Sequence, residues 1–255
     1  MNHRLNLFRM KAMILAAGLG TRLKPMTDRM PKALAPVGGT PMLEHILLKI
    51  KATGFISVVL NIHHFGEQII DFMLSNNNFG LKVDISDERD CLLDTGGGIK
   101  RASRFLNGDE PFLVHNVDTF SNVDLKAMYR SHLESNALAT LLTKPYRKTR
   151  QLLFDKSQRL CAWQNRETGE VKTHIPNFDP SNVQAYAFGG IHIISPQIFQ
   201  YMDEWPAKFS IIDFYLSACT QHPIRLYTET DLQLIDVGKQ SGLAEAEQFL
   251  RTKKN

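Results

Sequence analysis

Two glycines and two basic residues follow the first strongly apolar run of the chain, at residues 12–16. Gly18 and Gly20 allow positive φ angles and let a ligand approach the backbone closely. Successive N–H groups in such a turn form a concavity that binds anions. Arg22 adds a permanent positive charge beside it, and Lys32 lies between two prolines that restrict the loop. This spacing predicts a loop that holds phosphate groups.

Two other phosphate-binding patterns do not match the chain. The segment from Gly18 reads GxGxxL, so the third glycine of a dinucleotide-binding fingerprint is absent. Residues 30–42, where such a protein carries the acid that binds ribose, contain no Asp or Glu. The Walker pattern GxxxxGK(S/T) occurs nowhere in the sequence. A glycine-rich turn with two surface cations stays open as a purely structural alternative for the glycines alone.

Polar residues also follow two later apolar runs. Asn116 and Asp118 come after residues 112–115, and Asp236 comes after residues 234–235. Open α/β sheets bind their ligands at the carboxyl ends of parallel strands. An aspartate at a strand end is also a common turn former, so each carboxylate has a structural alternative.

The composition is that of an ordinary globular protein. Apolar residues make up 43% of the 255 residues and charged residues 22%, which excludes intrinsic disorder. No stretch approaches the ~20 apolar residues of a membrane helix, and the first residues lack the apolar core of a secretory signal. Three widely spaced cysteines predict reduced thiols and a cytoplasmic location. None of the nine histidines falls in an HExxH zinc pattern.

The formal net charge of +4 is unevenly distributed along the chain. The first 50 residues contain eight lysines and arginines and only two acidic residues. A local positive block in a nearly neutral protein suits a small anionic ligand better than a long polyanion. We therefore expect neither nucleic acid nor a membrane as a partner.

The phosphate loop and the carboxylates need a scaffold, and the apolar pattern predicts one. Short apolar runs alternate with amphipathic stretches up to residue 142, which is typical of βα units. We expect an α/β fold, with a Rossmann-like, mostly parallel sheet flanked by helices on both faces. The predicted strands are 12–16, 57–62, 81–85, 111–116 and 137–142, and the predicted helices are 41–52, 67–75, 98–106 and 124–131.

The pattern changes after residue 142. Short strand-like runs at 151–155, 160–164 and 171–174 are separated by turn formers. They predict a small antiparallel β insertion at residues 143–182. Further strands are expected at 183–194 and 224–228, and a closing helix at 241–251. We expect a single domain at 11–255, with residues 1–10 as an N-terminal extension.

The full pattern LAAGLGTRLxPxT, followed by PKALAPV, resembles the signature of the sugar-1-phosphate nucleotidyltransferases. In that family the loop holds a nucleoside triphosphate, and the residues at the positions of Arg22 and Lys32 neutralise its phosphates. The stretch LDTGGGI at 93–99 resembles the family's GTAGAL segment, where small residues let the base lie on the backbone. Its form looks most like the branch of N-acetylmuramate-1-phosphate uridylyltransferases. We expect its glycines to open a helix capped by Asp94 or Thr95.

The resemblance implies a nucleotide site, and Glu88 is a candidate acceptor for an N–H of the base. The implied nucleotide-binding residues are Ala16, Ala17, Gly18, Leu19, Gly20, Thr21, Glu88, Thr95, Gly96 and Gly97. Arg22 and Lys32 are the implied catalytic residues.

Aspartates at the positions of Asp118 and Asp236 hold magnesium in that family, and Mn²⁺ is expected to substitute. Magnesium prefers oxygen ligands and is often held by one or two carboxylates together with substrate phosphates. The chain departs from the family pattern at Val117, where a glycine is usual, and at Lys239–Gln240, which replaces Thr-Pro.

The sugar side matches less closely, because the family's Glu-Lys-Pro, whose lysine meets the sugar phosphate, is absent. The AWQN and TGE stretches near residue 165 resemble the uridylyltransferase branch instead. The candidate sugar-binding residues are Asn116, Arg147, Arg150, Trp163, Asn165 and Gly190. A tryptophan that fills a β-hairpin and an exposed basic loop explain Trp163 and the two arginines equally well.

The resemblance implies an enzyme that couples a sugar 1-phosphate to an NTP, giving an NDP-sugar and pyrophosphate. Uridylyl transfer is favoured, with guanylyl and thymidylyl transfer open, and the product would serve NDP-sugar and cell-wall biosynthesis. The alternative is a non-catalytic sugar-nucleotide-binding regulatory protein on the same fold. Such a protein is expected to lose the metal aspartates or the loop cations, and this chain has all four. The sugar, the base and the oligomeric state do not follow from the sequence.

Overall fold

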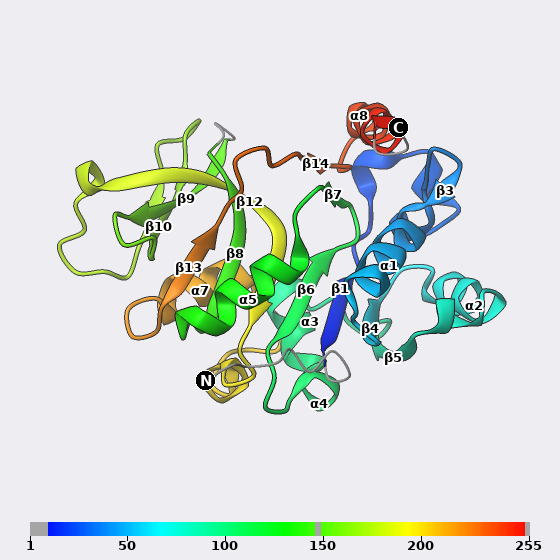
Figure 1. The fold of residues 1–255 in the computed structure, drawn as a ribbon, viewed down its shortest axis with the longest axis horizontal. Helices are drawn as coiled ribbons and strands as arrows, with labels where there is room; N and C mark the ends of the chain where they lie inside the picture. Colours follow the sequence, from blue (N-terminus) through cyan, green and yellow to red (C-terminus); the bar gives the residue numbers. More distant parts are fainter. Residues whose placement is uncertain (1–9, 146–148, 253–255) are drawn as a thin grey trace.

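The computed structural model describes residues 10–145 and 149–252. Its central sheet places β1 (Lys11–Leu15) parallel to β4 (Ser57–Ile62) on one side and to β6 (Phe112–Asn116) on the other (Figure 1). β5 (Lys82–Asp87) lies parallel to β4 at the sheet edge. The largely buried, apolar strands β1, β4 and β6 are typical of a sheet covered on both faces.

The register of the parallel strands determines which polar residues meet at the sheet edge. Leu15, the last residue of β1, pairs with Asn61 of β4 and with Asn116 of β6. The loop that follows β1 therefore starts between two asparagines that are 46 and 101 positions further along the chain than Leu15.

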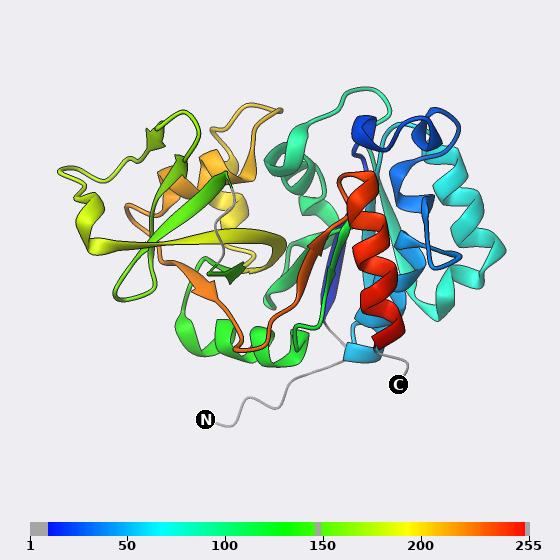
Figure 2. The same ribbon diagram turned by 90° about the horizontal axis from the view of Figure 1, so that it is seen from above.

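β12 (Val183–Ile194) extends this sheet into a second lobe, seen beside the parallel part in Figures 1 and 2. Its second half runs antiparallel to β6 and β8 (Ala139–Lys144), and its first half pairs with β9 (Arg150–Asp155). The outer strands are β10 (Leu160–Asn165) and β11 (Val171–Lys172), both antiparallel, and β13 (Ile224–Tyr227), which lies parallel to β8. The antiparallel strands of region 143–182 are thus continuous with the main sheet.

The helices cover both faces of the sheet, because successive side chains of a strand point to opposite faces. Ile14 belongs to one hydrophobic core and Met13 to the other. Residues of α1, α2, α5 and α8 pack in the first core, and residues of α3, α4, α6 and α7 in the second. The helices are α1 (Met42–Thr53), α2 (Gly66–Ser75), α3 (Asp94–Arg101), α4 (Ser103–Leu106), α5 (Leu125–Ser135), α6 (Ile198–Met202), α7 (Ile211–Ala218) and α8 (Gln240–Thr252). The predicted α/β class is confirmed.

Two short two-stranded sheets join distant parts of the chain or close a turn. β7 (Thr119–Ser121) pairs antiparallel with β14 (Leu234–Asp236), and β2 (Pro36–Val37) pairs with β3 (Thr40–Pro41). Within residues 10–145 and 149–252, no helix is long and apolar enough to cross a membrane.

The glycine-rich helix differs from its prediction. It begins at Asp94, with Leu93 as N-cap and no side-chain capping hydrogen bond, so the expected cap by Asp94 or Thr95 is wrong. The three glycines lie inside its first two turns. Thr95 instead uses its hydroxyl to accept a hydrogen bond from the N–H of Ile211 (3.0 Å), which ties α3 to the start of α7. A local sequence pattern cannot anticipate that distant partner.

Candidate active site

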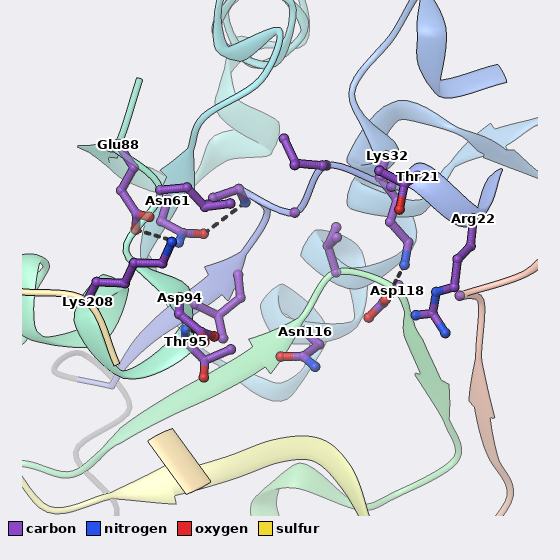
Figure 3. A pocket seen from close by; sticks show the side chains of 18 residues that line it. Thr21, Arg22, Lys32, Asn61, Glu88, Asp94, Thr95, Asn116, Asp118 and Lys208 are labelled. Carbon is purple, nitrogen blue, oxygen red and sulfur yellow. Dashed lines mark hydrogen bonds and ion pairs between the residues drawn. The ribbon is translucent and has the colours of Figure 1, made fainter. Parts of the chain in front are cut away.

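A cavity of about 540 Å³ opens at the carboxyl ends of β1, β4 and β6 (Figure 3). Side chains from distant segments converge in it, as ligand sites in open α/β sheets do. Its lining includes Ala17, Gly18, Leu19, Gly20, Thr21, Arg22, Lys32, Asn61, Glu88, Asp94, Thr95, Asn116, Asp118 and Lys208. Most residues of the predicted nucleotide site therefore line one space, whereas Ala16, Gly96 and Gly97 do not.

The loop after β1 has a conformation that requires glycine at one position. Gly20 adopts φ +64°, and a Cβ there would lie 2.8 Å from Cγ2 of Thr27 and 3.0 Å from Cβ of Lys32. Its carbonyl accepts hydrogen bonds from the N–H of Leu23 (2.8 Å) and the hydroxyl of Thr27 (2.9 Å). A Cβ on Gly18, by contrast, would meet no atom within 4 Å. The loop is thus packed from behind at Gly20 and open at Gly18, where it borders the cavity.

Asn61 holds the start of this loop, and sequence reasoning missed it. Its side-chain oxygen accepts hydrogen bonds from the N–H groups of Ala16 (2.7 Å) and Ala17 (3.3 Å). Its amide nitrogen donates to Glu88 (2.8 Å). Asn61 is 3% exposed, so these bonds satisfy a buried amide. The signal was present in the sequence, because Asn61 is a polar residue near the end of an apolar strand.

Glu88 lies at the far end of the same hydrogen-bond chain. Its second carboxyl oxygen accepts from the N–H of Leu93 (3.1 Å), just before α3. Burial raises the pKa of Glu88, and the hydrogen bonds from Asn61 and Leu93 oppose that change. A Cβ on Gly98 would lie 2.7 Å from the Glu88 carboxyl, so the third glycine makes room for this acid. Figure 3 shows Glu88 and Asn61 at one end of the cavity.

Gly96 and Gly97 serve a packing role. Both N–H groups donate to the carbonyl of Phe209 (2.9 and 3.2 Å). A Cβ on Gly96 would lie 2.4 Å from the Phe209 ring, and one on Gly97 would lie 2.1 Å from the carbonyl oxygen of Ala207. The glycines therefore let the segment around Lys208 lie directly on α3. Lys208, which the sequence analysis did not identify, lines the cavity from that segment.

The charged groups occupy the opposite end of the cavity. Lys32 forms an ion pair and hydrogen bond with Asp118; its side chain is 9% exposed and that of Asp118 is 21% exposed. Arg22 extends from the loop towards the turn after β14, where a Cβ on Gly238 would lie 2.7 Å from its guanidinium. Figure 3 shows Arg22, Lys32 and Asp118 together on this side.

The pairing of β7 with β14 brings the two predicted metal aspartates together. Asp236 pairs with Thr119, the residue after Asp118, and the N–H of Val237 donates to the carbonyl of Asp118 (2.8 Å). Asp118 and Asp236 both line a second cavity of about 210 Å³. Because Arg22, Asn116 and Asp118 line both cavities, the two spaces adjoin.

The second cavity contains two of the predicted sugar-binding residues. Asn116 and Gly190 line it together with Phe188. Gly190 adopts φ +69°, and a Cβ there would lie 2.5 Å from the side-chain nitrogen of Asn116. Glycine at this position therefore permits close contact with the asparagine that both cavities share.

The other sugar-side candidates lie elsewhere. Arg150 and Asn165 pair at the end of the β9–β10 hairpin, and the Asn165 side chain accepts from the N–H of Glu167 (3.0 Å) within its turn. Trp163 is half-buried beneath Lys172, whose ammonium lies 5.2 Å from the ring centroid. Neither cavity is lined by these residues. Arg147 falls outside the described residues. The positions of Arg150, Trp163 and Asn165 therefore do not support their predicted contacts with a sugar, and the prediction for Arg147 stays a prediction.

Fold and site together define the class of protein. A family model described as "Nucleotidyl transferase" matches residues 11–253, and the chain belongs to that family.

Individual relatives are sugar-1-phosphate nucleotidyltransferases. The chain is 40% identical over 122 residues to the N-acetylmuramate alpha-1-phosphate uridylyltransferase of Neisseria meningitidis, a match that covers 48% of this chain and 52% of that protein. It is 29% identical over 209 residues to the D-glycero-alpha-D-manno-heptose 1-phosphate guanylyltransferase of Aneurinibacillus thermoaerophilus, covering 81% and 84%. The match to the first relative thus spans about half of that protein's length.

A solved structure shows the same fold. HddC from Yersinia pseudotuberculosis, complexed with GMP-PN, superposes with a TM-score of 0.71 at 24% identity, covering 94% of this chain and 99% of that one.

Proposed function

We propose that this protein is an enzyme that transfers a nucleotidyl group from an NTP to a sugar 1-phosphate, releasing pyrophosphate. The observation that carries the proposal is the convergence of Arg22, Lys32, Asp118 and Asp236, from three separate stretches of the chain, on two adjoining cavities. A larger space at the sheet edge suits a nucleotide, and a smaller one beside it suits a sugar phosphate.

The donor set at the junction of the cavities fits a magnesium ion. Asp118, just before β7, and Asp236, at the end of β14, offer carboxylate oxygens, and substrate phosphates would complete an oxygen coordination shell. Mn²⁺ has similar oxygen preferences. When bound, such an ion neutralises phosphate charge and orients the reacting groups.

The chain's own residues would position and neutralise the phosphates. An oxygen of the sugar phosphate forms a bond to the α-phosphorus, and the bond from that phosphorus to the pyrophosphate oxygen breaks in line. The attacking oxygen is already anionic, so no general base is needed. Lys32, oriented by Asp118, would stabilise charge at the α-phosphate, and Arg22 would stabilise the leaving pyrophosphate.

The substrate pair proposed is UTP with an N-acylated, muramate-like sugar 1-phosphate. The uridylyltransferase relative has higher identity over its matched region than the guanylyltransferase relative, which supports uracil as the base. Contact with the sugar phosphate or its hydroxyls is assigned to Asn116 and Gly190, because both line the smaller cavity. The location proposed is the cytoplasm, where NTPs and sugar phosphates are made.

The deciding experiment incubates the purified protein with a panel of NTPs, sugar 1-phosphates and Mg²⁺, and detects pyrophosphate. Release with UTP and an N-acetylated sugar phosphate supports the full proposal. Release with GTP and mannose or heptose 1-phosphate keeps the reaction class and overturns the substrate pair. Tight binding of an NDP-sugar without release from any pair favours the non-catalytic alternative.

A further inference from the structure

The end of the large cavity that lies away from the phosphate-binding cations has its own polar side chains. Glu88 and Lys208 both line the cavity there, next to Asn61 (Figure 3). Arg22, Lys32 and Asp118 occupy the other end. If the triphosphate lies at the cationic end, as the proposed function requires, the nucleobase lies at the end with Glu88 and Lys208.

Lys208 is held in place through its neighbours. The N–H of Phe209 donates to the carbonyl of Leu93 (3.2 Å), and the carbonyl of Phe209 accepts from Gly96 and Gly97. Immediately before this segment, Lys100 donates to the carbonyl of Trp205 (2.7 Å). These bonds fix the backbone of the segment on α3, so the Lys208 side chain extends from a defined position.

The Lys208 ammonium has unused donors. Within residues 10–145 and 149–252 it makes no hydrogen bond or ion pair, in contrast to Lys32 and Lys100. The Asn61 side chain, by comparison, accepts from the N–H groups of Ala16 and Ala17 and uses one N–H to donate to Glu88. Lys208 is therefore the charged donor at this end. The Glu88 carboxyl borders the same space at 0% exposure and uses one lone pair of each oxygen for Asn61 and Leu93, so its remaining lone pairs are the acceptors there.

A donor beside an acceptor matches one class of base. Uracil and guanine present a carbonyl oxygen next to a ring N–H, whereas cytosine and adenine present an amino group at the corresponding position. An amino group facing an ammonium would oppose donor to donor and leave both without a partner in a closed site.

Resting on the proposed function, we propose that Lys208 donates a hydrogen bond to the exocyclic carbonyl oxygen of the base. Glu88 accepts from the adjacent ring N–H. Lys208 is thus a specificity-determining residue that selects uracil or guanine nucleotides over those of cytosine or adenine. The glycines of α3 contribute indirectly, because they allow the Lys208 segment to approach the cavity.

The test measures direct binding of UTP, GTP, CTP and ATP by isothermal titration calorimetry in magnesium buffer. The variants are Lys208→Met, which keeps an unbranched stem but removes the donor, and Lys208→Arg, which keeps a donor. Lys156→Met, at an exposed turn of the β9–β10 hairpin, is the matched control. We expect Lys208→Met to weaken binding of UTP or GTP, whichever the wild-type protein prefers, by about 10-fold or more, since it removes a charge-assisted hydrogen bond. Binding of CTP and ATP should change less than about twofold, and Lys208→Arg should recover most of the loss.

Two results would overturn the inference, and they differ in what they say of the proposed function. Equal weakening of all four nucleotides by Lys208→Met would place Lys208 at the phosphates or ribose and leave nucleotidyl transfer intact. Failure of the wild-type protein to bind any NTP would overturn the proposed function and the role of Lys208 with it.

Discussion

Because three histidines are buried, we expect the protein to lose stability as pH falls below neutral, well above the pH range in which carboxylates usually titrate. Burial lowers the pKa of His115 and His192 to about 3 and that of His132 to about 4, from 6.5. Lys49 and Asp118 also face His115, with opposite effects on its pKa. His132 bonds the hydroxyls of Thr140 and Ser195 on either side of its ring, at 2.9 and 3.0 Å. All three are therefore neutral in the folded protein near pH 6.

The size of the effect follows from the difference in proton binding. Between the folded pKa values and 6.5, the unfolded chain binds more protons, so the free energy of unfolding falls as pH falls. Each histidine contributes about 1.4 kcal/mol between pH 7.5 and 5.5, or ~4 kcal/mol for the three. Glu88 works in the opposite direction, because its folded-state pKa is raised. It binds its proton at higher pH in the folded than in the unfolded chain, so it offsets part of the histidine loss as pH falls.

Urea unfolding at pH 7.5 and 5.5 measures this difference. His132→Gln should reduce the loss of unfolding free energy between pH 7.5 and 5.5 by about one third, because the variant lacks one of the three histidines that take up a proton on unfolding. This difference between the two pH values does not depend on how the substitution changes stability at pH 7.5. His64→Gln, at an exposed position, is the control and should leave the difference unchanged. Equal stability of the wild-type protein at the two pH values would refute the reasoning, as would a smaller pH effect in the control than in His132→Gln.

Four further predictions concern the site and its support. Arg22→Ala should lower turnover by on the order of 10²–10³ with little change in Tm, and an unchanged kcat would remove Arg22 from the mechanism. Asp118→Asn should abolish pyrophosphate release while the protein stays folded by circular dichroism, and EDTA should do the same to the wild type; a fully active variant would contradict the metal site. Gly97→Ala should lower Tm and weaken nucleotide binding, because the added Cβ would lie 2.1 Å from the carbonyl oxygen of Ala207 and displace the segment that carries the cavity lysine. Asn165→Ala should lower the free energy of unfolding by about 1 kcal/mol or less and leave the KM for every sugar 1-phosphate unchanged, because the Asn165 side chain closes a turn. A rise in KM for one sugar alone would restore the predicted role of Asn165 in binding.

Much of the fold was predictable from local patterns. The strands at 57–62 and 183–194 have the predicted bounds, and α1 and α8 differ from prediction by one residue at each end. Short apolar runs that alternate with amphipathic stretches are typical of strands in a parallel sheet with helices on both faces, so their spacing predicts the sheet. The short strand β7 was not predicted, because three residues contain too few positions to show a period.

The sequence by itself determined the loop after β1 and the alternation that supports it. Gly20 takes a positive φ angle, and the cations at 22 and 32 follow it along the same stretch of chain, so the pattern is local and readable. Only the tertiary structure decided what lies across from that loop. Asn61, Glu88 and Lys208 meet in one cavity although up to 147 positions separate them. Gly96 and Gly97 proved to be contacts for residues 207–209, and Asn165 proved to close a turn. Such roles depend on which distant segment packs against a residue, and that is settled by the burial of the whole core rather than by neighbours in sequence.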